Sequence, residues 1–287
     1  MTLRFALCAD DYALTPAVSR GILELLGAGR LTAVSVLVTC PGWAGLAGEL
    51  KPFADIVDIG LHLNLTLGAP LGAMPGLAPS DRFPALGRLL PSALVGRLPA
   101  AEIAAEIARQ IDAFAEHFGR LPDYVDGHQH VHALPVIRDA LLRSLVERRL
   151  PGRFWLRDPG DRVHAIQARP LKRKALAVAA LTAGFAIQAA ASGFALNEGF
   201  AGFSNFDASR DYAAIFAASL RSPGPKHLVM CHPGYSDAAL ARLDPATSSR
   251  DAELAFLLSP RFPDVLATHS AGLMRLSEAP AVSLRGA

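Results

Sequence analysis

The sequence has few cysteines and no large surplus of charge of either sign. Its cysteines, Cys8, Cys40 and Cys231, are far apart and form no CxxC pair, which argues against a disulfide framework and against a cysteine zinc site. Lys and Arg number 28 against 26 Asp and Glu, so the sequence has no basic field of the kind that nucleic acid attracts. The run from Met1 to Ala9 is too short for a secretory signal. We therefore expect a cytoplasmic protein that binds a small ligand and no nucleic acid.

One segment lacks charge altogether. The stretch from Ala175 to Leu196 contains no Asp, Glu, Lys or Arg, and Lys172-Arg173-Lys174 precedes it. By length it reaches what a bilayer-spanning helix needs. However, alanine is the commonest residue of the segment, with Thr182 and Gln188 inside it, so its transfer into lipid is weakly favourable. We expect a largely buried helix or helix pair and no integral membrane span, and leave open whether the segment touches a membrane.

Short apolar runs alternate with amphipathic stretches along the chain, a pattern that predicts a parallel β/α fold. Pro16 to Gly27 and Ala101 to Phe118 carry apolar residues at helical spacing. Gly68 to Pro99 is rich in Gly and Pro, and we expect it to form an excursion over the active-site mouth. With no internal repeat or linker, we predict one α/β domain over residues 1–287, a TIM-like β/α barrel. The expected strands are Arg4 to Ala9, Ala33 to Thr39, Ile56 to Leu63, Tyr124 to Gly127, Arg153 to Arg157 and His227 to Cys231.

Polar residues cluster where these apolar runs end. Asp10-Asp11 follows the first run, His62 and Asn64 close the third, Asp126 to His132 follows the fourth, and His232 follows the last. Because the carboxyl ends of parallel strands face one side of such a fold, four distant segments are predicted to meet at one mouth.

A carboxylate and two imidazoles form a workable set of ligands for a catalytic divalent ion. Asp11, His62 and one histidine of the Asp126 to His132 run supply that set. Taken singly, His62 also fits a structural hydrogen bond, and the Asp pair also fits a cap for the helix that begins at Pro16. The three histidines of the run are His128, His130 and His132, and in an extended segment they would share a face. One ion does not need all three, so the surplus histidines would contact substrate or support a ligand.

Four motifs carry a resemblance to a known family. Ala9-Asp10-Asp11-Tyr12, Gly60 to Thr66, Asp126 to His132 and Cys231-His232-Pro233-Gly234 resemble, in order and spacing, the motifs of the YdjC-like carbohydrate deacetylases, which include chitooligosaccharide deacetylases and hopanoid-associated relatives. The resemblance extends to about Asp251.

This resemblance implies a distorted β/α barrel that removes an acetyl group from an N-acetylated sugar, in an oligosaccharide or a glycolipid. It also implies one divalent ion, Mg²⁺ or Zn²⁺, held by Asp11, His62 and His128. The chain departs from the commoner ADDFG form by having Tyr12 and Ala13. Asn197 to Phe200 resembles a family loop that approaches substrate.

Hydrolysis of an amide requires an activated water, a stabilised oxyanion and a protonated leaving nitrogen. A metal-bound water is the expected nucleophile, with Asp10 as its base and His232 as the acid. Arg157 would pair with Asp10 and keep it ionised. The alternatives are that Asp10 only orients a ligand, that His232 is structural, and that Arg157 lies on the surface. The residues that we expect to contact the sugar are Tyr12, Asn64, His130, His132, Glu198 and Phe200; for the aromatic ones core packing is the alternative.

Two other functions fit the same residues. A metal-dependent phosphoesterase also uses clustered His and Asp, although it usually needs ligands for a second ion, which His130 and His132 would have to supply. A non-catalytic sugar-binding barrel is the third reading. The sequence does not define the sugar, the native ion or whether the chain forms a homo-oligomer.

Overall fold

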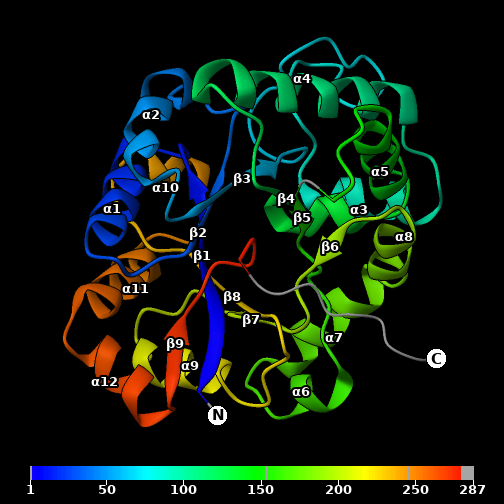
Figure 1. Cartoon of the computed structure of the whole chain (residues 1–287). Coiled ribbons are helices and arrows are strands. Elements are labelled where there is room, and N and C mark those ends of the chain that lie inside the picture. The colour runs from blue at the N-terminus through cyan, green and yellow to red at the C-terminus, as the bar shows by residue number, and fades with distance from the viewer. Residues whose placement is uncertain (1, 153, 245, 279–287) are drawn as a thin grey trace.

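The computed structural model describes residues 2–152, 154–244 and 246–278, and its strands form one curled parallel sheet surrounded by helices (Figure 1). Along the sheet the order is β6-β5-β4-β3-β2-β1-β8-β7, and β9 pairs with β1. Within the described residues no pairing joins β6 to β7, so the sheet is an open half-barrel. This confirms the predicted α/β class and its distortion. The strands are β1 (Leu3–Tyr12), β2 (Ala33–Val36), β3 (Asp58–Leu63), β4 (Tyr124–Gly127), β5 (Trp155–Leu156), β6 (Ala195–Leu196), β7 (Phe200–Ala201), β8 (His227–Cys231) and β9 (Ala271–Leu273).

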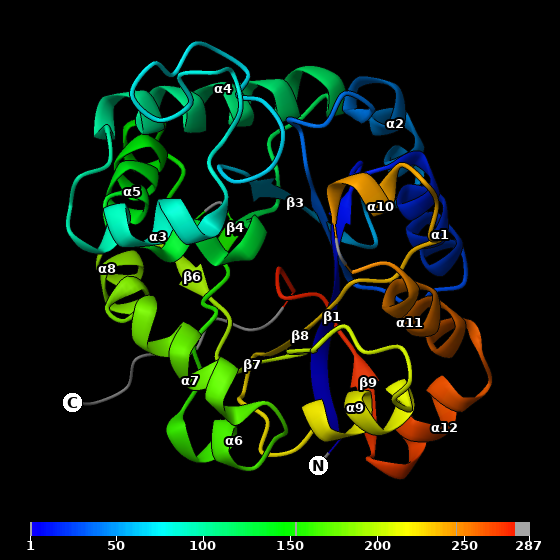
Figure 2. The ribbon, with the colours of Figure 1, turned by 180° about the vertical axis from the view of Figure 1, so that it is seen from behind.

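Helices cover the outside of this sheet, as Figures 1 and 2 show from opposite sides. The α-helices are α1 (Pro16–Gly27), α2 (Trp43–Leu50), α3 (Leu86–Leu94), α4 (Ala100–Phe118), α5 (Ile137–Glu147), α6 (Val163–Gln167), α7 (Lys172–Leu181), α8 (Phe185–Ala191), α9 (Tyr212–Ser219), α10 (Leu240–Leu243), α11 (Ser248–Leu258) and α12 (Arg261–Thr268). Two 3₁₀ helices, η1 (Lys51–Phe53) and η2 (His128–Ala133), complete the set.

The predicted helices α1 and α4 bury the apolar faces that their spacing indicated. The start of α1 is capped by Thr15, whose side-chain oxygen accepts the Val18 N–H, with Pro16 in the first turn. The alternative role of the Asp pair as this cap is therefore wrong. Of the predicted strand from Arg153 to Arg157, only Trp155 and Leu156 are extended and paired, and Arg153 lies outside the described residues.

The amino ends of the strands are closed by the end of the described chain. Asp58, at the start of β3, accepts hydrogen bonds from Trp155 Nε1 at 3.2 Å and from Arg275 Nε at 2.9 Å. Since β9 pairs with β1 just before Arg275, this segment covers the bottom of the sheet. The opposite end, where the strands finish, is left for the polar residues.

The structure of two long segments can be compared with their predictions. The segment from Gly68 to Pro99 contains α3, and its backbone at Leu71, Gly76 and Leu77 is held by carboxylates of α4, while its position over the mouth stays a prediction. The apolar segment forms α7 and α8, a helix pair as expected, but it is not largely buried, because Ile187 is 77% exposed. Among the described residues no single helix has the length and apolarity to cross a membrane; the pair α7–α8 together does by length and composition, with a bend of 47°.

Candidate active site

The two aspartates at the end of β1 point to different partners. Between Ala9 and Tyr12 the pairing of β1 with β2 is irregular, and Asp11 and Ala13 have φ angles of 72° and 73°. Positive φ is disfavoured for residues with a Cβ atom, so the strand end is held in a strained turn by the surrounding structure. The turn separates the neighbouring carboxylates and directs Asp10 towards Arg157 and Asp11 towards two histidines.

Asp11, His62 and His128 form one buried cluster. Asp11 Oδ1 lies 3.5 Å from His62 Nε2 and 3.1 Å from His128 Nδ1. One donor atom from each of the three residues lies within 4.8 Å of the other two. The structure thus brings together the three residues that the resemblance implied as ligands.

The orientation of His62 is fixed from behind by Asp126 on β4. His62 Nδ1–H donates to Asp126 Oδ1 at 2.6 Å, which leaves Nε2 facing Asp11. A lone pair on Nε2 would repel the Asp11 carboxylate, so a proton or a cation must lie between them. Burial lowers the pKa of His62, but the carboxylates of Asp126 and Asp10 outweigh it and raise that pKa. A buried ring facing a carboxylate, with its other nitrogen held by a second carboxylate, fits a divalent cation.

The histidine run does not form the expected extended segment. Residues His128 to Ala133 are the 3₁₀ helix η2, with Gln129 and His130 in left-handed backbone conformation, so the three rings diverge. His130 packs edge-on against Phe200 and Phe203. His132 is buried, with Nε2–H donating to the backbone oxygen of Arg157 at 2.7 Å. The prediction of a shared face is wrong, because periodicity in an extended strand was applied to a left-handed turn.

Arg157 is fully buried and holds Asp10. Its two terminal nitrogens donate to the two oxygens of Asp10 at 2.7 and 2.6 Å, and its Nη2 also lies 2.6 Å from Asp126 Oδ2. The surface alternative for Arg157 is therefore wrong. Although burial raises it, the pKa of Asp10 is held well below its usual range by this guanidinium.

Among the described residues, one other cluster has side chains that could bind a metal ion: Cys8, Asp10 and Asp126. The same guanidinium occupies the space between them. Arg157 Nη2 lies 3.0 Å from Cys8 Sγ and close to both carboxylates. A fixed positive charge at this point leaves no room for a second cation. The phosphoesterase reading therefore finds no second ion site there, and His130 and His132 are held by other contacts.

His232 stands on the far side of Asp10, after the last residue of β8. Its Nε2 lies 3.9 Å from Asp10 Oδ2, and Phe206 packs edge-on against its ring. Burial lowers the pKa of His232 to about 4, while Asp10 and Asp11 act to raise it. Its backbone N–H donates at 2.6 Å to Glu253 of α11, whose own pKa is raised to about 7 by burial.

Sequence reasoning missed Arg250. Its Nη2 lies 2.6 Å from Asp11 Oδ2 and 2.6 Å from Asp244 Oδ2, and the side chain is 1% exposed. Burial raises the pKa of Asp11, but Arg250 and His128 outweigh it and keep that pKa well below the usual range. Nothing in the local sequence marks Arg250, because it comes from α11, far from Asp11 along the chain.

The predicted sugar contacts are spread more widely. Tyr12 is fully buried and its hydroxyl donates to the Leu46 backbone oxygen, and Asn64 is buried in hydrogen bonds to its own turn, so their placement gives the sugar prediction no support. Phe200 is 1% exposed and lies under Arg157, with 5.8 Å from Cζ to the ring centroid. Glu198 is 44% exposed and lies 3.7 Å from Lys226 Nζ. Substrate contact by these residues stays a prediction.

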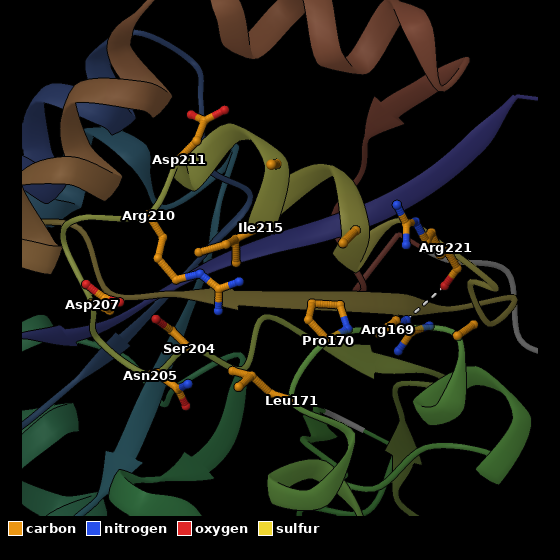
Figure 3. Close-up of a pocket in the computed structure, with 13 residues that line it drawn as sticks. Arg169, Pro170, Leu171, Ser204, Asn205, Asp207, Arg210, Asp211, Ile215 and Arg221 are labelled. Atoms are coloured by element: carbon orange, nitrogen blue, oxygen red, sulfur yellow. Dashed lines mark hydrogen bonds between the residues drawn. The ribbon is translucent and has the colours of Figure 1, made fainter.

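A cavity of about 530 Å³ lies beside this site and not in it. Figure 3 shows Arg210 reaching into the cavity, opposite Ser204 and Pro170. The loop that carries Ser204 and Asn205 also carries Phe206, which packs on His232. One short loop thus forms a wall of the cavity and borders the candidate site.

The open parallel barrel and its Asp-His-His cluster define the class, an α/β protein with a candidate hydrolase site at the carboxyl ends of its strands. More narrowly, the chain belongs to the YdjC-like protein family, whose model matches residues 4–268. This confirms the resemblance drawn from the four motifs.

A chitooligosaccharide deacetylase of Klebsiella pneumoniae (strain 342) is 38% identical over 130 residues, 45% of this chain and 50% of the relative. A chitooligosaccharide deacetylase of Yersinia enterocolitica is 30% identical and covers 81% of this chain and 82% of the relative. In the Klebsiella match and in those to two further chitooligosaccharide deacetylases, the chain spans about half the length of the curated relatives. A crystal structure from Enterococcus faecalis, described as a cellobiose-phosphate cleavage protein, matches with a TM-score of 0.72 at 20% identity, covering 96% of this chain and 98% of that one. That likeness shows the fold alone.

Proposed function

We propose that this protein is a metal-dependent carbohydrate deacetylase that hydrolyses the acetamide of an N-acetylated sugar, in an oligosaccharide or a glycolipid. The observation that carries the proposal is the meeting of Asp11, His62 and His128 within 4.8 Å, next to an arginine-held carboxylate and a histidine. Membership of a family whose curated members are named chitooligosaccharide deacetylases supports the substrate class.

Asp11, His62 and His128 would hold one divalent ion. Arg250 would orient Asp11, and Asp126 would orient His62. A bound Zn²⁺ or Mg²⁺ would polarise the acetyl carbonyl and raise the acidity of the attacking water, which suits a weakly basic carboxylate nearby. Two imidazole ligands favour zinc, whereas carboxylate and water favour magnesium.

Asp10 is assigned the role of base. Both of its oxygens accept hydrogen bonds from Arg157, so the guanidinium keeps it ionised and fixes its orientation. Asp10 Oδ2 also lies 3.9 Å from His232 Nε2. From there Asp10 accepts the proton of the attacking water.

His232 is assigned the role of acid to the departing amine. Its low pKa means that it is neutral at pH 7 before substrate binds. Negative charge that builds on the tetrahedral centre stabilises the protonated ring, so its pKa rises as the reaction proceeds. With the higher pKa the ring can take up the proton that Asp10, 3.9 Å away, accepted from the water, and it then passes this proton to the leaving nitrogen as the C–N bond breaks.

The test is release of acetate from N,N′-diacetylchitobiose by the purified chain, before and after chelation and with Zn²⁺ or Mg²⁺ restored. We expect turnover that chelation removes and one ion restores. Release of phosphate from a generic ester without acetate would favour the phosphoesterase reading, and sugar binding without turnover in metal-replete protein would favour a binding module. We further expect a cytoplasmic enzyme; oligomeric state would be measured in the same preparation.

A further inference from the structure

The helix pair α7–α8 presents an outer face with an unusual composition. From Arg162 to Asn197 the sequence contains no Asp or Glu, while it contains Arg162, Arg169 and the run Lys172-Arg173-Lys174. Arg169 is buried against Asp161 and is not available to a partner. Lys172 and Arg173 are exposed, and neither side chain makes a hydrogen bond or ion pair with a described residue.

The two helices bury one side each and expose the other. Ala175 packs inward from α7, and Phe185 and Ala189 pack inward from α8. On the outer side Leu176 is 37% exposed and Ile187 is 77% exposed, surrounded by alanines. Figures 1 and 2 show both helices at one edge of the molecule, outside the sheet.

We propose that the outer face of α7–α8 docks on the surface of a bilayer that contains anionic lipids. Helices that lie in a membrane interface typically have basic side chains without acidic neighbours beside an exposed apolar face. Lys172 and Arg173 would meet the headgroups, and Leu176 and Ile187 would enter the boundary with the acyl chains. The alanine-rich face makes this contact shallow, reversible and sensitive to salt.

A protein partner fits this face less well. Protein interfaces gain most of their energy from aromatic and arginine side chains that fill pockets on the partner. Here the phenylalanines of the segment, Phe185 and Phe194, are buried in this chain's own core. The side chains that remain exposed on α7–α8 are mostly small, and the charged ones are all basic, which suits a fluid anionic surface.

The docking face borders the candidate active site. Lys174 Nζ donates to the Ser204 backbone oxygen at 2.8 Å and lies 5.1 Å from the Phe206 ring centroid. Phe206 in turn packs against His232. The inference does not depend on the proposed function, because membrane binding is measured without turnover.

The experiment is co-sedimentation of the purified full chain with vesicles of phosphatidylcholine alone or mixed with phosphatidylglycerol. We expect binding to the anionic vesicles at low salt, little binding to the neutral ones, and release by high salt. The double variant Lys172→Gln with Arg173→Gln should bind on the order of 25-fold more weakly, about fivefold for each cation. Ile187→Ser should also weaken binding.

The matched control neutralises two exposed cations at the opposite edge, near α2 and α10: Lys51→Gln with Arg242→Gln. It has the same net charge as the test variant and should bind like the parent. Equal loss in control and test variants, or no binding to anionic vesicles, overturns the proposal. Self-association that needs Ile187 without vesicle binding would identify a protein interface instead, and extraction only by detergent would identify a membrane span.

Discussion

The assignment of different roles to the two neighbouring aspartates can be tested by replacing each with asparagine. Asp10→Asn keeps the shape of the side chain but removes the proposed base, and it exchanges one acceptor oxygen facing Arg157 for an amide that cannot accept. Asp126 still pairs with Arg157 at 2.6 Å, so the guanidinium is not left without a counter-charge. The structural cost is therefore one charge-assisted hydrogen bond, about 2–3 kcal/mol, or a fall in Tm of roughly 4–6 °C.

Catalysis should suffer more than stability. Loss of a general base lowers kcat by roughly a hundredfold to ten-thousandfold, with little change in substrate affinity. Metal binding should survive in Asp10→Asn, because its side chain pairs with Arg157 and not with the histidine cluster. Asp11→Asn removes the carboxylate shared by His62 and His128, so it should weaken metal binding and be partly rescued by excess ion.

The assays are metal stoichiometry after dialysis and initial rates of acetate release, measured on both variants and the parent at one temperature well below their Tm. If Asp10→Asn loses the ion while Asp11→Asn keeps it, the roles are reversed. If neither variant slows acetate release, the hydrolytic mechanism is wrong.

Three further outcomes are expected. His128→Ala should lose most bound metal and nearly all turnover, and full metal content with full rate would contradict its assignment as a ligand. Glu253→Gln removes a carboxyl whose pKa burial raises from 4.5 to about 7. Because the folded state holds this proton more tightly than the unfolded state, ionisation of Glu253 destabilises the parent. This loss of stability is absent below pH 4.5 and complete above pH 7. The Tm of the variant relative to the parent should therefore rise between pH 5 and pH 8, by the equivalent of at most about 3 kcal/mol, and a flat difference would refute this linkage. Ala13→Gly should raise Tm by roughly 1–3 °C, since glycine adopts a φ of 73° without strain, and a fall in Tm on calorimetry would count against strain at that turn.

Much of the fold could be predicted from the sequence because long buried strands and helices leave a periodic record. The runs that became β1, β3, β4 and β8 and the faces of α1 and α4 are of this kind. Strands of two or three residues, such as β6, β7 and β9, are too short to produce a pattern and depend on pairing partners far away.

The site, too, could be predicted only in part. Residues at strand ends could be predicted to meet, since topology alone brings Asp11, His62 and His128 together. The direction of a side chain on a left-handed turn could not, which is why the rings of His130 and His132 were misplaced. The contribution of Arg250 also escaped, because a helix residue acquires its partner only through tertiary packing.

Arg157 has a consequence for how this site can change over time. One guanidinium is shared by Asp10 and by Asp126, which holds His62, so the residue that tunes the base also steadies a ligand. Substitutions at these positions should be strongly non-additive, and a lineage could not alter one without compensating at the others. The three should therefore be inherited as a unit, and an engineer who transplants the Asp-His-His cluster to another barrel would need to carry the buried arginine with it.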